Sequence, residues 1–233
     1  MPTALITGAT EGIGRATAFA LGRAGYSVGV CARTPSKLRT LLDDLAQAKL
    51  TAAGHPADVG VESDVKAMIT VITAALGPID VLVNNAGVAI LKPFDQMTLD
   101  EWDTTMATNL RSMFLVTREV LPAMRAAKQG AIINVSSLAG RSGFAGGTAY
   151  CASKHAVLGF SRALMMEVRK DGVRVITICP GSVDTPLIRN QSTLTPNLDK
   201  ILHADDIAET ILCTLRLPLR ATVSELDIRP SNP

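Results

Sequence analysis

A tyrosine, a lysine and a serine in the second half of the chain have residue types and a spacing suited to proton transfer. Tyr150 and Lys154 are four residues apart, so a helix would place both side chains on one face. A free tyrosine has a pKa of ~10, and a neighbouring ammonium group lowers it by favouring the phenolate. With Ser137 upstream, the pair is expected to exchange a proton with a substrate oxygen. The alternative is a surface lysine and a half-buried tyrosine that share a helix face by accident.

A glycine-rich segment near the N-terminus has the order of elements that binds a diphosphate. The apolar run 4–7 predicts a strand, and a helical pattern extends to Gly25. Between them lies Gly8-Ala9-Thr10-Glu11-Gly12-Ile13-Gly14, with the spacing GxxxGxG rather than GxGxxG. A strand, a glycine loop and a helix N-terminus place backbone N–H groups against a diphosphate. Turns also use glycine for positive φ, so the loop alone is weak support.

The rest of the chain alternates short apolar runs with longer helical patterns. Further strands are expected at 26–32, 50–57, 79–83, 131–135, 173–179 and 223–228. Helices are expected at 36–49, 61–76, 98–127, around Tyr150 to about 170, and 204–215, with an irregular polar segment at 182–202. Such alternation predicts parallel βαβ units. The expected fold is α/β, a single doubly wound Rossmann-type domain over residues 1–233 with a mostly parallel seven-stranded sheet and helices on both faces.

Polar and glycine-rich segments follow most of the expected strands. They are residues 8–14, Arg33, Asp58, residues 84–87, Ser137 and Pro180-Gly181. Ligands of doubly wound sheets bind beyond the carboxyl ends of the strands. These segments are therefore expected to form one site at one edge of the sheet.

Composition argues against several other classes of protein. The chain has 233 residues, 47% hydrophobic and 3% aromatic, which suits an aliphatic core around parallel strands. A net charge of +2 without a basic stripe argues against nucleic-acid binding. No apolar run reaches ~18 residues and no targeting segment precedes the first strand, so a cytoplasmic protein without membrane contact is expected. There is no metal-ligand spacing, and Cys31, Cys179 and Cys213 are expected in the core.

Several short motifs occur in one fixed order between the first and sixth strands. They are Thr7-Gly8-x-x-x-Gly12-Ile13-Gly14, Asp58, Asn84-Asn85-Ala86-Gly87, Asn109, Ser137, Tyr150-x-x-x-Lys154 and Pro180-Gly181-x-x-x-Thr185. As a set they resemble a classical short-chain dehydrogenase/reductase. The C-terminal remainder departs from the family, because Leu217-Pro218 and residues 224–230 replace its glycine-rich turn. This ending resembles that of a subgroup acting on 3-hydroxy acids and related small alcohols.

The resemblance implies four catalytic residues: Ser137, Tyr150, Lys154 and Asn109. Tyr150 would be the general acid in ketone reduction and the base in alcohol oxidation, while Lys154 would lower its pKa and bind the nicotinamide ribose. Ser137 would donate to the substrate oxygen, and Asn109 would hold a water that links Lys154 to solvent. Alternation along an extended segment sends Ser136 the opposite way from Ser137, as a plain polar strand-end residue. The alternative for Asn109 is an exposed polar position.

The resemblance also implies a dinucleotide site and no metal. Asp58 would contact adenine, although an acid at a helix N-terminus is the alternative, and Thr185 would meet the carboxamide. Asn84 is a candidate for stabilising the sheet instead. The expected cofactor-binding residues are Gly8, Thr10, Gly12, Ile13, Gly14, Arg33, Asp58, Val59, Asn85, Ala86, Gly87, Tyr150, Lys154, Pro180, Gly181, Val183 and Thr185.

The end of the second strand favours NADP(H) over NAD(H). An acid there would bind the ribose 2′-OH and repel a 2′-phosphate, but this chain has Ala32, followed by Arg33. The planar, permanently charged guanidinium suits a phosphate, and Lys37 would add a second charge. Glu11, in the glycine loop, argues the other way unless Arg33 also pairs with it.

The expected function is hydride transfer between NADP(H), or less favourably NAD(H), and a small carbonyl or secondary alcohol. The alternative is a non-catalytic, dinucleotide-binding regulatory or scaffold protein on the same fold. Residues 182–203 are expected to form the substrate loop.

The resemblance implies a homo-oligomer, a tetramer or dimer, through the helices around Asn109 and Tyr150. An apolar face for this contact, or for the core, is offered by Phe114, Val120, Leu121, Leu158, Phe160 and Leu164.

Overall fold

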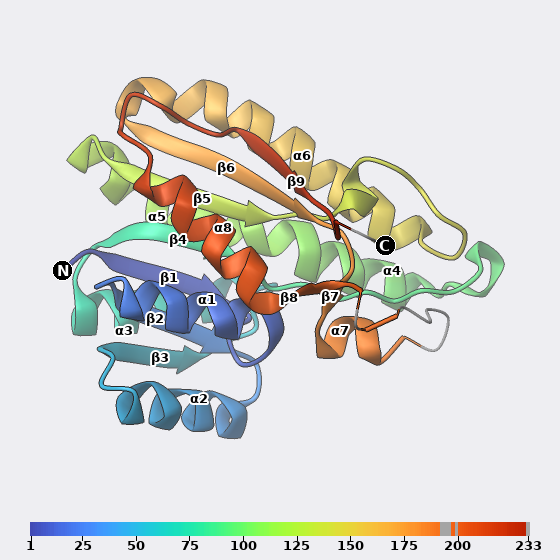
Figure 1. Cartoon of the computed structure of the whole chain (residues 1–233), viewed down its shortest axis with the longest axis horizontal. Helices are drawn as coiled ribbons and strands as arrows, with labels where there is room; N and C mark the ends of the chain where they lie inside the picture. Colours follow the sequence, from blue (N-terminus) through green and yellow to red (C-terminus); the bar gives the residue numbers. More distant parts are fainter. Residues whose placement is uncertain (192–196, 199, 232–233) are drawn as a thin grey trace.

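A seven-stranded sheet runs through the centre of the molecule (Figure 1). The computed structural model describes residues 1–191, 197–198 and 200–231. The strand order is β3-β2-β1-β4-β5-β6-β9, and every neighbouring pair is parallel. The strands are β1 (Thr3–Thr7), β2 (Ser27–Ala32), β3 (Ala52–Pro56), β4 (Ile79–Asn84), β5 (Gly130–Val135), β6 (Val173–Pro180) and β9 (Glu225–Ile228). The predicted α/β fold with a seven-stranded sheet is confirmed.

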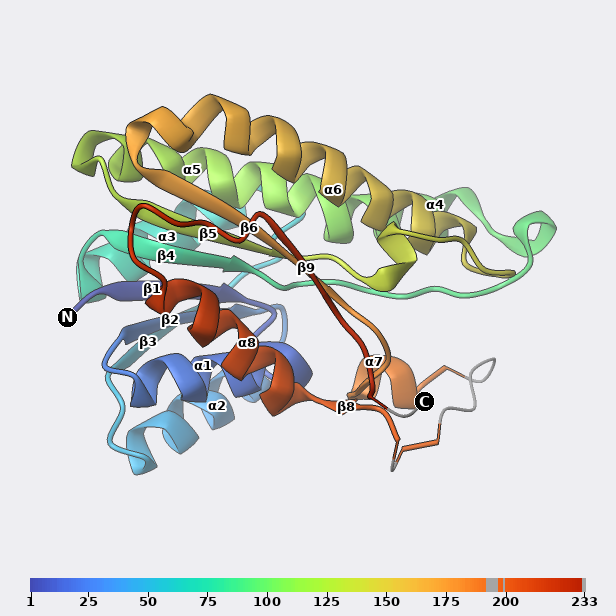
Figure 2. The same ribbon diagram turned by 45° about the horizontal axis from the view of Figure 1, so that its top comes forward.

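Helices cover both faces of this sheet, as Figure 2 shows. One layer contains α1 (Gly12–Arg23), α2 (Pro35–Gln47) and α8 (Ala204–Arg216). The opposite layer contains α3 (Glu62–Leu76), α4 (Leu99–Met106), α5 (Ser112–Ala127) and α6 (Thr148–Val168). The predicted boundaries agree with these elements to within a few residues.

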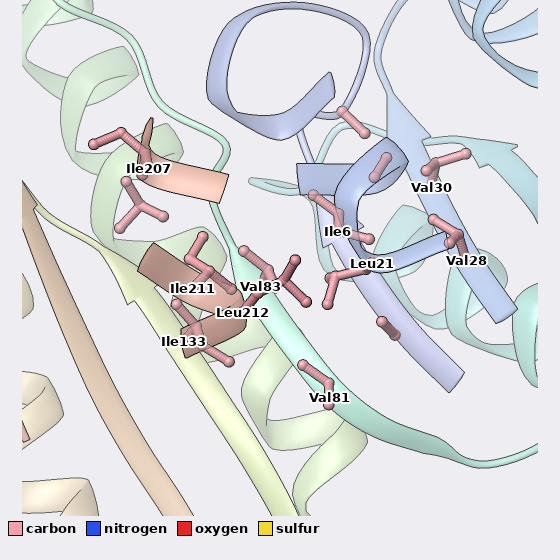
Figure 3. Packing of buried hydrophobic residues seen from close by; sticks show 14 of the residues in the cluster. Ile6, Leu21, Val28, Val30, Val81, Val83, Ile133, Ile207, Ile211 and Leu212 are labelled. Carbon is pink, nitrogen blue, oxygen red and sulfur yellow. The ribbon is translucent and has the colours of Figure 1, made fainter. Parts of the chain in front are cut away.

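Alternate residues of each central strand enter opposite cores. Ile6 packs in the core under α1 and α8, whereas its neighbour Leu5 packs in the core under α3 and α5. Figure 3 shows the first of these cores, where Ile133 lies near Ile211 and Leu212 of α8. Because both faces of the strands are buried, each strand reads as a continuous aliphatic run.

The strand order reverses beside β1, which fixes the position of the site. The chain proceeds outward from β1 to β2 and β3, and then returns to place β4 on the other side of β1. The loops after β1 and β4 therefore diverge at the carboxyl edge of the sheet. A crevice at such a switch point is where open α/β sheets bind ligands.

The helical region predicted at 98–127 is interrupted by a wide π-helical turn at Ala107–Arg111. It begins at a capping box, in which Thr98 accepts a hydrogen bond from the Glu101 N–H at 3.3 Å. Asn109 lies within the π turn. Wide turns of this kind accommodate one extra residue and often occur at functional sites.

The segment predicted to be irregular at 182–202 contains short elements. Strands β7 (Val183–Asp184) and β8 (Leu202–His203) pair in parallel and bring the two ends of the segment together. Between them lies α7 (Pro186–Arg189), which starts with a proline, a residue pre-organised for the first helical turn. Residues 192–196 and 199 of the predicted substrate loop lie outside the described residues.

The prediction for the cysteines is wrong at one position. Cys31 and Cys179 are buried, but Cys213 is exposed. Ile207, Ile211 and Leu215 form the buried face of α8, and the helical period turns Cys213 away from that face.

Within the described part of the chain, no helix combines the length and the apolar character needed to cross a bilayer.

Candidate active site

A cavity of about 580 Å³ opens at the carboxyl edge of the sheet. It brings together most of the predicted cofactor and catalytic residues: Gly8, Thr10, Gly12, Ile13, Arg33, Asp58, Val59, Asn85, Ala86, Gly87, Ser137, Tyr150, Lys154, Pro180, Gly181, Val183 and Thr185. Two predicted residues, Gly14 and Asn109, do not line it. No group of His, Cys, Asp or Glu side chains suited to a metal occurs among residues 1–191, 197–198 and 200–231.

The glycine loop is shaped by close backbone contacts. Gly8 has φ of 64°, and a Cβ there would lie 2.8 Å from the Ala86 Cα. A Cβ at Gly14 would collide with the Gly8 carbonyl oxygen and the Asn85 side chain. Gly14 therefore packs α1 against the loop, while Gly8 and Gly12 lie open to the cavity. Such a bare backbone surface at a helix N-terminus fits a dinucleotide diphosphate.

Side chains of Thr7 in β1 and of Asn85, directly after β4, hold this loop in place. The Asn85 side-chain amide donates to the Thr7 carbonyl at 2.9 Å and to the Gly8 carbonyl at 3.1 Å. The Thr7 hydroxyl accepts from the backbone N–H groups of Asn85 and Ala86, both at 3.0 Å. Sequence reasoning gave Thr7 no such role, because its partners are 78 and 79 residues away.

The Asn84 side chain points into the core between β4 and β5. Its amide donates to Asn134 at 2.9 Å and to Thr117 at 3.1 Å, and Asn134 donates to Ser161 at 2.9 Å. Asn84 does not line the cavity. The structure thus agrees with the interpretation that this residue stabilises the sheet.

Ser137 and Ser136 follow β5 and both line the cavity, but their side chains have different partners. Ser137 hydrogen-bonds Tyr150 and accepts from the Ala139 N–H at 3.1 Å. Ser136 is buried and donates to the Lys154 carbonyl at 3.0 Å. Ser136 is therefore more than a plain strand-end residue, because it fixes the helix that carries Tyr150 and Lys154.

Tyr150 and Lys154 share one face of α6, but the expected lowering of the tyrosine pKa is wrong for this structure. Burial raises the pKa of Tyr150, and the hydrogen bond from Ser137 only partly opposes this rise. The Lys154 ammonium donates to the Val135 carbonyl at 3.0 Å and lies 5.8 Å from the centroid of the Tyr150 ring. Burial lowers the pKa of Lys154 to about 8.

Asn109 is fully buried, which rules out the exposed alternative. Its side-chain oxygen accepts from the Val88 N–H at 2.8 Å. Its amide donates to the Val88 carbonyl and to the Ser153 hydroxyl, both at 2.9 Å. Asn109 thus joins the π turn to the segment after β4 and to α6. The role of holding a water next to Lys154 stays a prediction.

The adenosine end of the cavity is lined by charged side chains. Arg33 follows β2 and is exposed, while Lys37 pairs with Glu11 at 3.2 Å. The pairing that would offset the charge of Glu11 is therefore made by Lys37. Asp58 follows β3, and its carboxylate accepts from the Gly60 N–H at 2.8 Å. Asp58 therefore both lines the cavity and fixes the turn that leads into α3.

Comparison with known proteins places this geometry in a family. The model for short chain dehydrogenases matches residues 2–195, so the chain belongs to the short-chain dehydrogenase family. A putative ketoacyl reductase of Streptomyces coelicolor is 40% identical over 186 residues, covering 79% of this chain and 71% of that protein. The D-beta-hydroxybutyrate dehydrogenase of Rhizobium meliloti is 37% identical over 191 residues, covering 81% and 74% respectively.

A solved structure agrees with the sequence comparisons. The crystal structure of a metagenomic short-chain oxidoreductase in complex with NADP has a TM-score of 0.87 and 37% identity, and the match covers 100% of this chain and 98% of that one. The predicted NAD(P)-dependent oxidoreductase acting on CH–OH or C=O groups is confirmed. The regulatory or scaffold alternative finds no support in these comparisons.

Proposed function

We propose that this protein transfers a hydride between NADP(H) and a small ketone or secondary alcohol, with Ser137, Tyr150 and Lys154 as its catalytic residues. The observation that carries the proposal is that these three side chains line the same cavity as the glycine loop. The bound dinucleotide supplies or accepts the hydride. Gly8, Gly12 and the N-terminus of α1 hold its diphosphate.

Tyr150 moves the proton. Its phenol is protonated at neutral pH, because the ordinary pKa of a tyrosine is ~10 and burial raises the pKa further; this is the form that ketone reduction requires. Ser137 donates a hydrogen bond to the substrate oxygen as negative charge develops there. In the oxidation direction Tyr150 accepts the proton as a phenolate, and the Lys154 ammonium, 5.8 Å from the centroid of the Tyr150 ring, stabilises this phenolate before the transfer. Lys154 also binds the nicotinamide ribose, and Asn109 positions α6.

NADP(H) is the preferred cofactor in this proposal. Ala32 at the end of β2 offers no carboxylate to the ribose 2′-OH, and Arg33 beside it lines the adenosine end of the cavity. Glu11 would repel a 2′-phosphate, but its pairing with Lys37 offsets part of that charge. The metagenomic relative of similar fold was solved with NADP.

The remaining roles follow the arrangement of the cavity. Asp58, Val59, Asn85, Ala86 and Gly87 line the adenosine side, and Thr185 meets the carboxamide, beside Pro180, Gly181 and Val183. Residues 182–203 form the substrate loop, because Leu187, Ile188 and Gln191 of this segment line the cavity. Residues 1–233 form one domain, which acts in the cytoplasm.

The protein assembles as a homo-oligomer, a tetramer or dimer, through the α5 and α6 layer. Phe114 supports this assignment, because it is 48% exposed on α5. Val120, Leu158 and Leu164 are buried, so for these three residues the core interpretation holds. Leu121 and Phe160 are partly buried and pack against the same core.

The proposed function is tested by measuring NADPH and NADH oxidation with a panel of ketones and aldehydes. Wild type should show the higher kcat/KM with NADPH, and Ala32→Asp/Arg33→Ala should reverse or remove this preference. A wild-type preference for NADH, or an unchanged ratio in the double variant, would reject the cofactor assignment. The absence of turnover with every carbonyl and both cofactors would reject the proposed reaction.

A further inference from the structure

Charge is distributed very unevenly within the cavity. Its charged lining residues, among those described, are Glu11, Arg33, Lys37, Asp58 and Lys154. The first four follow β1, β2 and β3. Ser137 follows β5, which lies three strands from β2 in the sheet. Neighbouring strands are ~4.8 Å apart, so β2 and β5 are separated by about 14 Å. The charged groups of the adenosine end are therefore remote from the reacting carbon.

The opposite end of the cavity, here called the substrate end, is apolar. It is formed by Val88, Leu91, Leu138, Phe144, Leu187 and Ile188, from the segments after β4 and β5 and from α7. Uncharged polar residues in this part of the lining include Thr108, Ser142, Ser182 and Gln191. The amide nitrogen of Gln191 already donates to the Ala89 carbonyl at 2.8 Å and to the Leu187 carbonyl at 3.2 Å. The Gln191 amide nitrogen is therefore already engaged with the backbone.

Two described cations on the segments that flank this end, Lys92 and Arg189, have partners elsewhere and do not line the cavity. Lys92 pairs with Glu101 at 2.7 Å, and Arg189 pairs with Asp184 at 2.5 Å. Lys154 is buried and donates to the Val135 carbonyl. Residues 192–196 and 199, which lie outside the described residues, include no basic residue in the sequence.

We infer that the substrate is an uncharged, largely apolar ketone or the corresponding secondary alcohol, and that keto and hydroxy acids are poor substrates. A carboxylate at the substrate end would lose water without gaining a cation or a set of N–H donors, which is strongly unfavourable. The inference rests on the proposed function. It departs from the 3-hydroxy-acid subgroup suggested by the C-terminal sequence, and from the compound in the name of the hydroxybutyrate dehydrogenase relative.

The test compares two substrates that share the 3-oxobutanoyl group but differ in charge and in one ester methyl group: methyl 3-oxobutanoate and the 3-oxobutanoate anion. With saturating NADPH at neutral pH, kcat/KM should be roughly a hundredfold higher for the ester, as expected when a carboxylate has no partner. A ratio below about ten, or a preference for the acid, would overturn the inference.

A binding measurement separates this inference from the proposed reaction. Ligand-observed NMR with Tyr150→Phe and NADP⁺ should detect the ester, while the anion should bind at least about tenfold more weakly. If wild type turns over neither these compounds nor any carbonyl of the panel, but this difference in binding appears, the proposed reaction fails and the inferred substrate class holds. Equal binding of the two, or binding of neither, overturns the substrate class.

A gain-of-function variant provides the converse test. Leu187→Arg places a cation at the partly exposed start of α7, and Leu187→Met is the matched uncharged control. The arginine variant should raise the acid-to-ester ratio of kcat/KM by roughly tenfold, and salt should reduce this gain. The methionine variant should leave the ratio near the wild-type value. An equal change in both variants would contradict the inferred lack of a cation.

Discussion

The Asn109 side-chain amide donates a 2.9 Å hydrogen bond to the Ser153 hydroxyl, and that hydroxyl donates in turn to the Tyr150 carbonyl at 2.7 Å. The π turn is thereby tied to the first turns of α6, where Tyr150 and Lys154 lie. Because Asn109 also pairs with both backbone groups of Val88, one buried amide connects three segments of the site.

Asn109→Leu should lower the free energy of unfolding by about 1–3 kcal/mol, since it leaves both part-buried backbone groups of Val88 without their side-chain partner. Ser153→Ala removes a single contact of Asn109 and should lower the free energy of unfolding by less than Asn109→Leu does. Urea denaturation of both variants measures the difference. Equal stability of Asn109→Leu and wild type would show that this amide is not a structural link.

Tyr150→Phe should reduce kcat by several orders of magnitude, because it removes the hydroxyl that carries the proton. The dinucleotide affinity should stay nearly unchanged, since the glycine loop is intact. NADPH fluorescence titration and steady-state kinetics measure the two quantities. Retention of more than about a tenth of kcat would exclude Tyr150 as the proton-transfer residue.

Lys154 should make stability rise with pH in the alkaline range. Burial lowers its pKa from 10.5 to about 8, so between these values the unfolded chain binds a proton that the folded protein does not. Between about pH 7 and pH 9.5, wild type should gain about 2 kcal/mol in free energy of unfolding relative to Lys154→Met. Denaturation at both pH values measures this gain, and parallel pH curves for the two proteins would contradict it.

Glu11→Gln should strengthen NADPH binding by roughly threefold to tenfold, because it removes a carboxylate from the phosphate end and frees Lys37. NADH binding should change little. Lys37→Met is the converse variant and should weaken NADPH binding. Fluorescence titration measures the affinity of each variant for NADPH and for NADH. Weaker NADPH binding by Glu11→Gln would instead show that Glu11 positions Lys37 for the phosphate.

Light scattering at micromolar concentration should show an oligomer for wild type. Phe114→Glu places a charge on the exposed face of α5, where burial against a second copy would be unfavourable, and should shift the protein toward the monomer. Phe114→Leu keeps the face apolar and serves as the control. A monomeric wild type would reject the proposed assembly.

The fold was predictable because each strand and helix has a strong local pattern. The aliphatic runs at β1, β4, β5 and β6 identify strands that are buried on both faces. The cavity-lining motifs follow these strands, so their convergence could be predicted from topology alone.

Features that depend on long-range contacts could not be predicted. The Lys37–Glu11 pair joins side chains 26 residues apart, and the pKa of Tyr150 depends on burial rather than on its spacing to Lys154. The two-residue strands β7 and β8 are too short to leave a periodic signal. The π turn could not be predicted either, because the residues around Asn109 have an ordinary helical pattern in the sequence.

The wide turn at Ala107–Arg111 has a consequence for insertions and deletions. Because the wide turn holds one extra residue, deletion of one residue here would restore an ordinary α-helical turn and change the directions of the side chains within that turn. Asn109 would then no longer face Val88 and Ser153. The contacts of Asn109 therefore depend on the number of residues in this turn as well as on the asparagine itself. A homologue with a one-residue gap at this position would need another way to anchor α6.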